Sequence, residues 1–280
     1  MAPPTTDRSG IERLCVFGMP PVAFIGLAAD LGCRHIGIGL AAMRRYNPHD
    51  YPDWSFKDDP ALRRETAAAL RDQGVAISLM EGFSVRPGAD VRDQAADLDV
   101  VRELGGRRIN VASINPDLGQ TLDDFAILAE MAEARGIETT IEIGPGPING
   151  LPAAMVAVRH VGRPSFRLLI DTMHYFRFGG TVADVAALDP AVIGYVQLCD
   201  VPLVSTHARY MDEALYERLP PGQGELPLAE LLAVLPPDVV ISLEVPQRSL
   251  AEAGLGPRER VGPCVEAARR MLDKAAQRTV

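Results

Sequence analysis

Lysine is scarce in this chain of 280 residues, and the cysteines are few and scattered. Only two lysines, Lys57 and Lys274, stand among the 28 basic residues, so catalysis through a lysine Schiff base is not expected. The four cysteines lie far apart and form no CxxC pair. They therefore indicate reduced thiols rather than a disulfide framework or a zinc site.

Long apolar runs are missing as well. No run approaches the ~18 residues of a membrane span, and the first residues lack the apolar centre of a secretory signal. We therefore expect a cytoplasmic protein that makes no membrane contact. The net charge of −9 also disfavours a nucleic-acid partner, because a phosphate backbone needs a basic surface.

The composition is that of a globular protein with a sizeable core, at 47% hydrophobic and 23% charged residues. Short, nearly continuous apolar runs recur along it, as expected for strands covered on both faces. They are 14–17, 35–40, 75–81, 108–113, 138–143, 167–171, 194–198 and 239–245. Helical spacing follows in stretches such as 61–73, 92–104, 122–135 and 228–234, with Asp59 and Thr121 as predicted N-caps.

Eight alternating units predict a parallel sheet that closes into a (β/α)8 TIM barrel, with residues 1–280 forming a single domain. The competing fold is a doubly wound open sheet, which usually carries a glycine-rich phosphate loop after its first strand. Here the first run is followed by Gly18-Met-Pro-Pro21, with no GxGxxG motif. The sequence therefore favours the barrel.

Two long segments follow predicted strands, at the face where such barrels keep their active sites. Residues 41–59 are rich in aromatic side chains, and residues 201–226 hold His207 and Arg218. Several aromatic side chains in one exposed loop usually pack against a ligand or another protein surface. A substrate lid and a homodimer contact account for them equally well.

Polar side chains end the last four predicted strands: Glu142, Asp171, Gln197 and Glu244. In a parallel barrel these ends converge, so three carboxylates would share one enclosed place. Desolvated carboxylates repel one another and need a proton, an arginine or a cation. Because the strand ends carry no arginine, we expect one divalent metal ion held by these four residues. An all-oxygen set favours Mn²⁺ or Mg²⁺, with Zn²⁺ or Co²⁺ as alternatives.

Several segments in the second half of the chain resemble the sugar phosphate isomerase/epimerase family, whose fold is a xylose isomerase-like TIM barrel. The matching segments are Ile-Glu142-Ile, Leu-Ile-Asp171-xx-His174, Val-Gln197-Leu-Cys-Asp200, Arg218-Leu-Pro-Pro-Gly-Gln-Gly224 and Ser-Leu-Glu244-Val. The resemblance implies a metal-dependent isomerase or epimerase of carbohydrate metabolism. It also implies that His174 and Arg218 touch oxygens of a small sugar, polyol or cyclic keto substrate.

Gln197 departs from the histidine that is commoner at this position in the family. Dehydratase-type relatives that act on 3-dehydroshikimate also have glutamine here, so the runner-up is a lyase of the 3-dehydroshikimate dehydratase or inosose dehydratase type. A nuclease on this fold would need more than the five histidines present and a basic face. A binding protein without chemistry is disfavoured by the intact carboxylates.

The chemistry that fits is removal of a proton next to a carbonyl, giving an enolate or enediolate. Glu142 and Glu244 are the predicted catalytic residues, one abstracting and the other returning the proton. Expulsion of a β-hydroxyl with the help of His174 would instead give a dehydrated product. Glu81 and His207 are further candidates for substrate binding.

Overall fold

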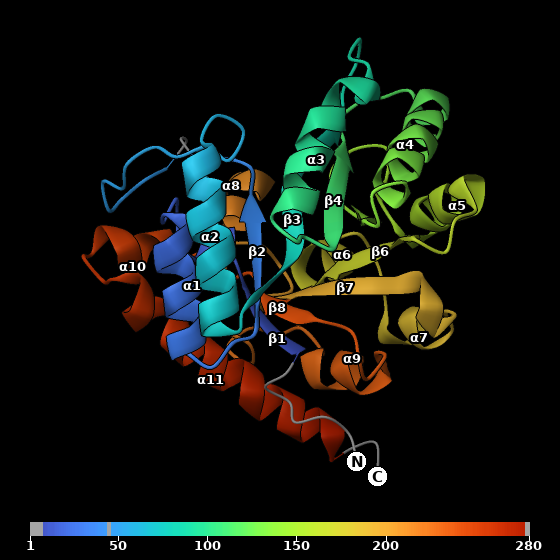
Figure 1. The fold of residues 1–280 in the computed structure, drawn as a ribbon. Helices are drawn as coiled ribbons and strands as arrows, with labels where there is room; N and C mark the ends of the chain where they lie inside the picture. Colours follow the sequence, from blue (N-terminus) through green and yellow to red (C-terminus); the bar gives the residue numbers. More distant parts are fainter. Residues whose placement is uncertain (1–7, 44–45, 278–280) are drawn as a thin grey trace.

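The computed structural model describes residues 8–43 and 46–277. The segment on which the expectation about a secretory signal rests lies largely outside this range. Eight strands form a closed barrel in which each strand pairs in parallel with the next, and β1 pairs with β8 (Figure 1). This confirms the predicted (β/α)8 TIM barrel. No helix in the described part of the chain combines the length and the apolar character that crossing a bilayer requires.

The strands are β1 (Ser9–Glu12), β2 (His35–Gly39), β3 (Ala76–Val85), β4 (Arg108–Ser113), β5 (Glu138–Glu142), β6 (Phe166–Asp171), β7 (Ile193–Leu198) and β8 (Ile241–Leu243). The helices are α1 (Pro21–Asp30), α2 (Pro60–Gln73), α3 (Ala95–Glu103), α4 (Leu118–Glu133), α5 (Leu151–Val161), α6 (Thr172–Arg177), α7 (Val182–Ala186), α8 (Tyr210–Tyr216), α9 (Leu228–Val234), α10 (Arg248–Glu252) and α11 (Pro257–Ala276). Short 3₁₀ turns are η2 (Arg13–Cys15), η3 (Val91–Gln94) and η4 (Pro190–Val192).

The first predicted strand, residues 14–17, is wrong. The strand is Ser9–Glu12, and the apolar run begins in the buried 3₁₀ turn η2 that follows it. The run is apolar because it packs in the core outside the barrel, where the guanidinium of Arg260 stacks over the Phe17 ring. The strand itself contains Ser, Gly and Glu, so it lacks the apolar character by which the other strands were found.

One of the two predicted N-caps is confirmed and the other is wrong. Asp59 caps α2 as predicted, accepting hydrogen bonds from the backbone N–H groups of Ala61 and Leu62. Helix α4 starts earlier than predicted, because Asp117 is its N-cap and accepts from the N–H of Gln120. Thr121 is instead inside the helix and buried, and its hydroxyl bonds that of Ser113.

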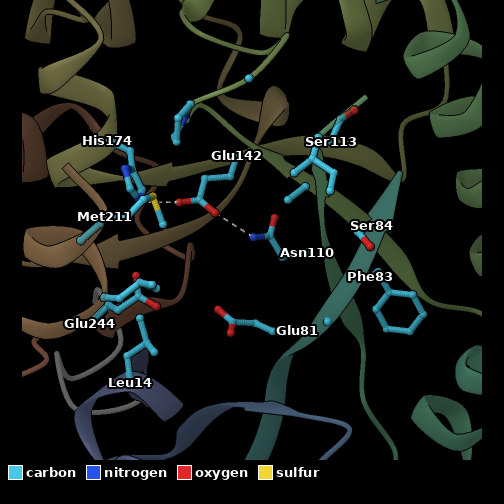
Figure 2. A pocket seen from close by; sticks show the side chains of 18 of the residues that line it. Leu14, Glu81, Phe83, Ser84, Asn110, Ser113, Glu142, His174, Met211 and Glu244 are labelled. Carbon is cyan, nitrogen blue, oxygen red and sulfur yellow. Dashed lines mark hydrogen bonds and ion pairs between the residues drawn. The ribbon is translucent and has the colours of Figure 1, made fainter. Parts of the chain in front are cut away.

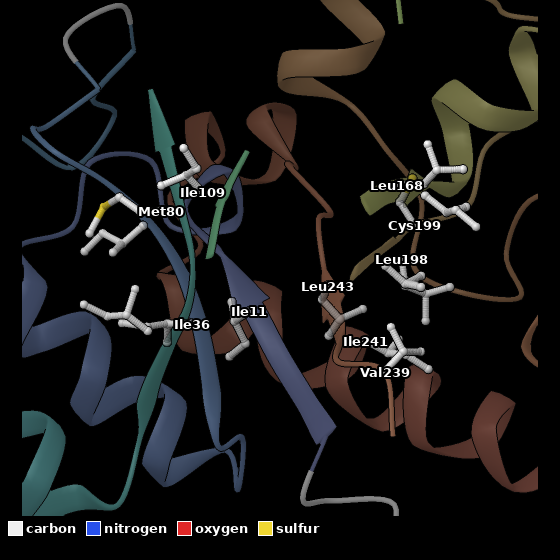
Figure 3. Close-up of a cluster of buried hydrophobic side chains, with 14 of the residues drawn as sticks. Ile11, Ile36, Met80, Ile109, Leu168, Leu198, Cys199, Val239, Ile241 and Leu243 are labelled. Carbon is white, nitrogen blue, oxygen red and sulfur yellow. The ribbon is translucent and has the colours of Figure 1, made fainter. Parts of the chain in front are cut away.

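The hydrophobic core lies mainly between the strands and the surrounding helices, not inside the barrel. Figure 3 shows part of this shell, with Ile11, Ile36, Ile109, Leu168 and Leu243 on different strands. A separate small cluster is formed by Leu79, Leu169 and Tyr195, with Val240 packed against it. The outer shell fixes the strands, so the polar groups at their C-terminal ends are held on a rigid support.

Candidate active site

A cavity of about 740 Å³ lies at the C-terminal ends of the strands. It is lined by five of the residues that the sequence singled out: Glu81, Glu142, His174, Arg218 and Glu244. Figure 2 shows Glu81, Glu142, His174 and Glu244 arranged around the same space. The barrel thus brings together residues that are up to 163 positions apart in the sequence, from Glu81 to Glu244.

Glu142 is the last residue of β5, and polar side chains approach its carboxylate from two sides. The Asn110 side chain on β4 donates through Nδ2 to Glu142 Oε2 at 3.0 Å. The Nε2 atom of His174 lies 3.3 Å from Glu142 Oε1, and its Nδ1 atom contacts the Tyr210 hydroxyl. Tyr210 on α8 therefore orients the imidazole that faces Glu142.

Asp171 ends β6 and starts helix α6. Its carboxylate accepts a hydrogen bond of 2.9 Å from the backbone N–H of His174, as an N-cap does. This cap explains the spacing of two residues between Asp171 and His174, because the first helical turn places the imidazole beside the capping carboxylate. One carboxylate oxygen each from Glu142 and Asp171 and one ring nitrogen of His174, the atoms that could bind a metal ion, lie within 4.8 Å of one another.

Arg218 neutralises part of this negative charge, so the expectation that no arginine serves the carboxylates is wrong. Its Nη1 atom lies 2.5 Å from Asp171 Oδ2 and 3.1 Å from Glu244 Oε2. All three side chains are buried. Arg218 comes from the segment after α8 rather than from a strand end, so only the folded chain reveals the pairing.

The segment that carries Arg218 is tied to β7 by Asp200. The Asp200 carboxylate accepts hydrogen bonds from the backbone N–H groups of Gly222 at 2.8 Å and Leu226 at 3.1 Å. Gly224 passes so close that a Cβ there would lie 2.5 Å from the Val201 carbonyl oxygen. The Gly-Gln-Gly sequence therefore serves a tight backbone approach that positions the arginine.

Gln197 on β7 links two of the carboxylates. Its Nε2 atom donates to Glu81 Oε1 at 3.1 Å and to Glu244 Oε1 at 3.3 Å. Asp171 and Gln197 are each 1% exposed and lie behind the residues that line the cavity. Potential ligand atoms form two groups, one from Glu142, Asp171 and His174 and one from Glu12, Glu81 and Glu244. Arg218 joins the groups through Asp171 and Glu244, and the sharing of one metal ion by the four predicted residues stays a prediction.

Two charged residues of this centre were missed because β1 was misplaced. Arg13 forms an ion pair with Glu81 and lines the cavity, and Glu12 lies fully buried at the end of β1. The Tyr195 hydroxyl donates to Glu12 Oε1 at 2.8 Å. A Cβ at Gly37 would lie 1.6 Å from Glu12 Oε2, so a glycine is needed beside this carboxylate. The sequence feature that could have revealed these residues is the pair Glu12-Arg13, which stands directly before the apolar run 14–17.

Burial dominates the electrostatics of the site. It raises the pKa of Glu142 to about 8, with the charges of Asp171 and Glu81 adding to the effect. Burial also raises the pKa of Glu244 well above its usual value. For Asp171 burial acts in the same direction, but Arg218 outweighs it and holds the pKa below its usual range. Burial lowers the pKa of His174 to about 4, so its imidazole is neutral at pH 7.

The site holds more acidic side chains than basic ones. Within the described part of the chain, five carboxylates gather here and two guanidinium groups, those of Arg13 and Arg218, contact them. The carboxylates belong to Glu12, Glu81, Glu142, Asp171 and Glu244. Their raised pKa values mean that Glu12, Glu142 and Glu244 favour the protonated form at pH 7 when no cation is near. A divalent ion would displace these protons and pair with the carboxylate oxygens. The residues present therefore fit a metal ion, in addition to the charge that Arg218 already supplies.

His207 and the aromatic side chains described in residues 41–59 do not line the cavity, although Met43 of the same segment does. The backbone N–H of His207 bonds the Ser205 hydroxyl, and neither residue lines the cavity. Tyr46 packs edge-on against Phe17 and Tyr216 instead of covering the site. A role for His207 in substrate binding, and one for this loop in a homodimer, stay predictions.

Known proteins with related sequences or folds include both isomerases and lyases. A 3-dehydroshikimate dehydratase from Pseudomonas aeruginosa is 28% identical over 184 residues, which cover 61% of this chain but only 29% of that longer protein. The structure of a D-psicose 3-epimerase in the presence of D-fructose has a TM-score of 0.71 at 14% identity, covering 95% of this chain and 99% of that one.

The structure of an IOLI protein with a bound zinc atom has a TM-score of 0.73 at 15% identity, covering 98% of this chain and 99% of that one. These likenesses between structures concern the fold. The family model described as the xylose isomerase-like TIM barrel matches residues 25–274, which is most of the chain. The protein therefore belongs to the xylose isomerase-like TIM barrel family.

Proposed function

We propose that the protein is a divalent-metal-dependent isomerase or epimerase of a small polyhydroxy-keto compound. The observation that carries this proposal is that the half-buried Glu142 and the buried Glu244 line one cavity, and that each has a raised pKa and so takes up a proton readily. One glutamate removes the proton next to the substrate carbonyl, and the other returns it to the carbon. The product is then an epimer or an isomer.

The metal ion would be held by Glu142, Asp171, Gln197 and Glu244. When bound, it would polarise the substrate carbonyl and stabilise the negative charge of the enolate. Arg218 remains beside Asp171 and Glu244, where its guanidinium orients their carboxylates and is positioned to donate to a substrate oxygen. The neutral imidazole of His174 lines the cavity and offers a second hydrogen-bonding group.

Metal content is the first test. The protein purified with Mn²⁺ is expected to hold about one divalent ion per chain, because the four proposed donor side chains would share a single ion. Elemental analysis measures the ratio, and chelation is expected to abolish turnover until Mn²⁺ or Mg²⁺ is returned. If the purified protein contains no ion and its activity is unaffected by a chelator, the proposed metal dependence is wrong.

A second candidate is dehydration of a cyclic hydroxyketone. It is favoured by Gln197 in place of the commoner histidine and by the similarity to the 3-dehydroshikimate dehydratase. In this reaction Glu142 takes the proton from carbon and forms the enolate, and the β-hydroxyl leaves as water. The neutral His174, whose Nε2 atom lies 3.3 Å from Glu142 Oε1, would pass that proton from the glutamate to the leaving hydroxyl.

One experiment separates the two reactions. Panels of ketoses and of cyclic hydroxyketones, 3-dehydroshikimate among them, are incubated with the metal-loaded protein in D₂O. An isomerase or epimerase incorporates deuterium at carbon without a new ultraviolet absorbance. A dehydratase produces the absorbance of a conjugated product. Absence of both from every panel member would contradict both candidates.

A further inference from the structure

The cavity has an apolar side as well as its ring of charged groups. The side chains of Met43, Ile114, Met211 and Leu215 line it and retain accessible surface. They come from three separate parts of the chain: the segments after β2 and β4, and helix α8. Met211 lines the same cavity as His174 and Glu142, and Figure 2 shows these side chains around its interior.

Two of these side chains are unusually exposed for their type. Ile114 is 58% exposed and Met211 is 44% exposed, and both line the same cavity. Single exposed hydrophobic residues are ordinary on a protein surface. Several that line one cavity beside a polar centre instead form the wall of a ligand site, in which a few polar groups orient a mainly apolar ligand.

The size of the cavity points the same way. At about 740 Å³ it falls in the range of ~300–1,000 Å³ that holds drug-sized ligands. A free sugar carries hydroxyl groups on every side, and those facing Ile114 and Met211 would be desolvated without partners, which is unfavourable. A ligand with one oxygen-rich end and one apolar end would satisfy both sides of the cavity.

We infer that the substrate is a hydroxyketone bearing an apolar ring or chain, which lies against Met43, Ile114, Met211 and Leu215 while its oxygens face Glu142 and Glu244. This inference rests on the proposed function only for the orientation of the hydroxyketone end. The apolar wall itself follows from the exposure of these side chains. It assigns the protein to substrates larger and less polar than simple sugars.

Two probes that share one reactive group test this inference. Hydroxyacetone and 2-hydroxyacetophenone both contain a hydroxymethyl ketone, and they differ in carrying a methyl group or a phenyl ring. Binding to the Mg²⁺-loaded protein is measured by saturation-transfer NMR titration. The phenyl probe is expected to bind at least about tenfold more tightly, because its ring loses water on the apolar wall. Equal affinities would overturn the inference.

Substitutions of cavity-lining residues test whether the apolar wall causes the tighter binding of the phenyl probe. Ile114→Ser and Met211→Ser are each expected to weaken binding of the phenyl probe by about three- to tenfold. The affinity for hydroxyacetone, which has no ring to contact the wall, is expected to stay the same. Both side chains are well exposed, so the fold is expected to tolerate the changes. Leu203→Ser is the matched control, because Leu203 is 61% exposed but does not line the cavity. An unchanged affinity in both wall variants would contradict the assignment.

Deuterium exchange of the hydroxymethyl protons in D₂O, followed in the same samples, keeps the two proposals apart. A binding preference without exchange supports the apolar wall and counts against enolate chemistry. Exchange of both probes without any binding preference supports enolate chemistry and overturns the apolar substrate.

Discussion

Turnover is expected to fall by at least ~10²-fold in Glu142→Gln and in Glu244→Gln, because each variant loses a group that accepts or returns a proton. The amide keeps the size of the side chain and one oxygen, so the shape of the cavity is preserved. The measurement is the initial rate on the best substrate found in the D₂O panels. Metal content is determined on the same samples, so that loss of the ion and loss of the base are distinguished.

The control for this pair is Glu252→Gln. Glu252 pairs with Arg248 at the surface of α10, and its side chain is 51% exposed. Its amide variant is expected to turn over substrate at the unaltered rate. A glutamate variant at position 142 or 244 that retains both its metal and its full rate would refute the catalytic role given to that residue.

Removal of the buried arginine is expected to have the largest effect on stability. In Arg218→Met the carboxylates of Asp171 and Glu244 lose their guanidinium partner in the interior. Breaking such a pair costs about 3–5 kcal/mol, since an uncompensated charge stays buried. Urea unfolding of metal-free protein at pH 7 measures the difference in the free energy of unfolding.

A surface pair supplies the comparison. Arg209 pairs with Asp212 within α8 and its N-terminal turn, and the arginine side chain is 79% exposed. Arg209→Met is expected to change the free energy of unfolding by no more than about 1 kcal/mol, as exposed ion pairs contribute little. Equal stabilities for the two methionine variants would mean that Arg218 does not compensate the buried carboxylates.

Most of the barrel could be predicted from the sequence because its strands are covered on both faces. The apolar runs match the bounds of β4 and come within one residue of those of β2, β5, β6 and β7. The predicted run ends four residues before the end of β3 and extends two residues beyond each end of β8. The strand that was missed altogether is β1, whose Gly10 and Glu12 face the polar centre of the barrel. A strand that contributes charge to the site lacks the pattern that marks a strand, so the missed strand and the missed site residue have one cause.

The residues at the strand ends were predictable for a related reason. A carboxylate inside an apolar run, as at Glu142, Asp171 and Glu244, costs free energy on burial unless it binds a partner such as a cation or a hydrogen-bond donor. Such a residue is therefore a candidate for a functional site. Parallel strands then bring such residues to the same end of the sheet. Arg218 carried no comparable signal, because its segment has no regular pattern and its place depends on the bonds that Asp200 makes to Gly222 and Leu226.

By itself, the order of apolar and polar residues determined the barrel and the acidic side chains at the C-terminal ends of its strands, since both depend on spacing along the chain. The tertiary structure alone decided which charges meet and which apolar side chains stay uncovered. Arg218 reaches Asp171 across 47 positions, and Ile114 and Met211 line one cavity although 97 positions separate them. Contacts of this kind depend on how the loops that follow different strands pack against one another. No local pattern in the sequence specifies which of these distant residues come close in space.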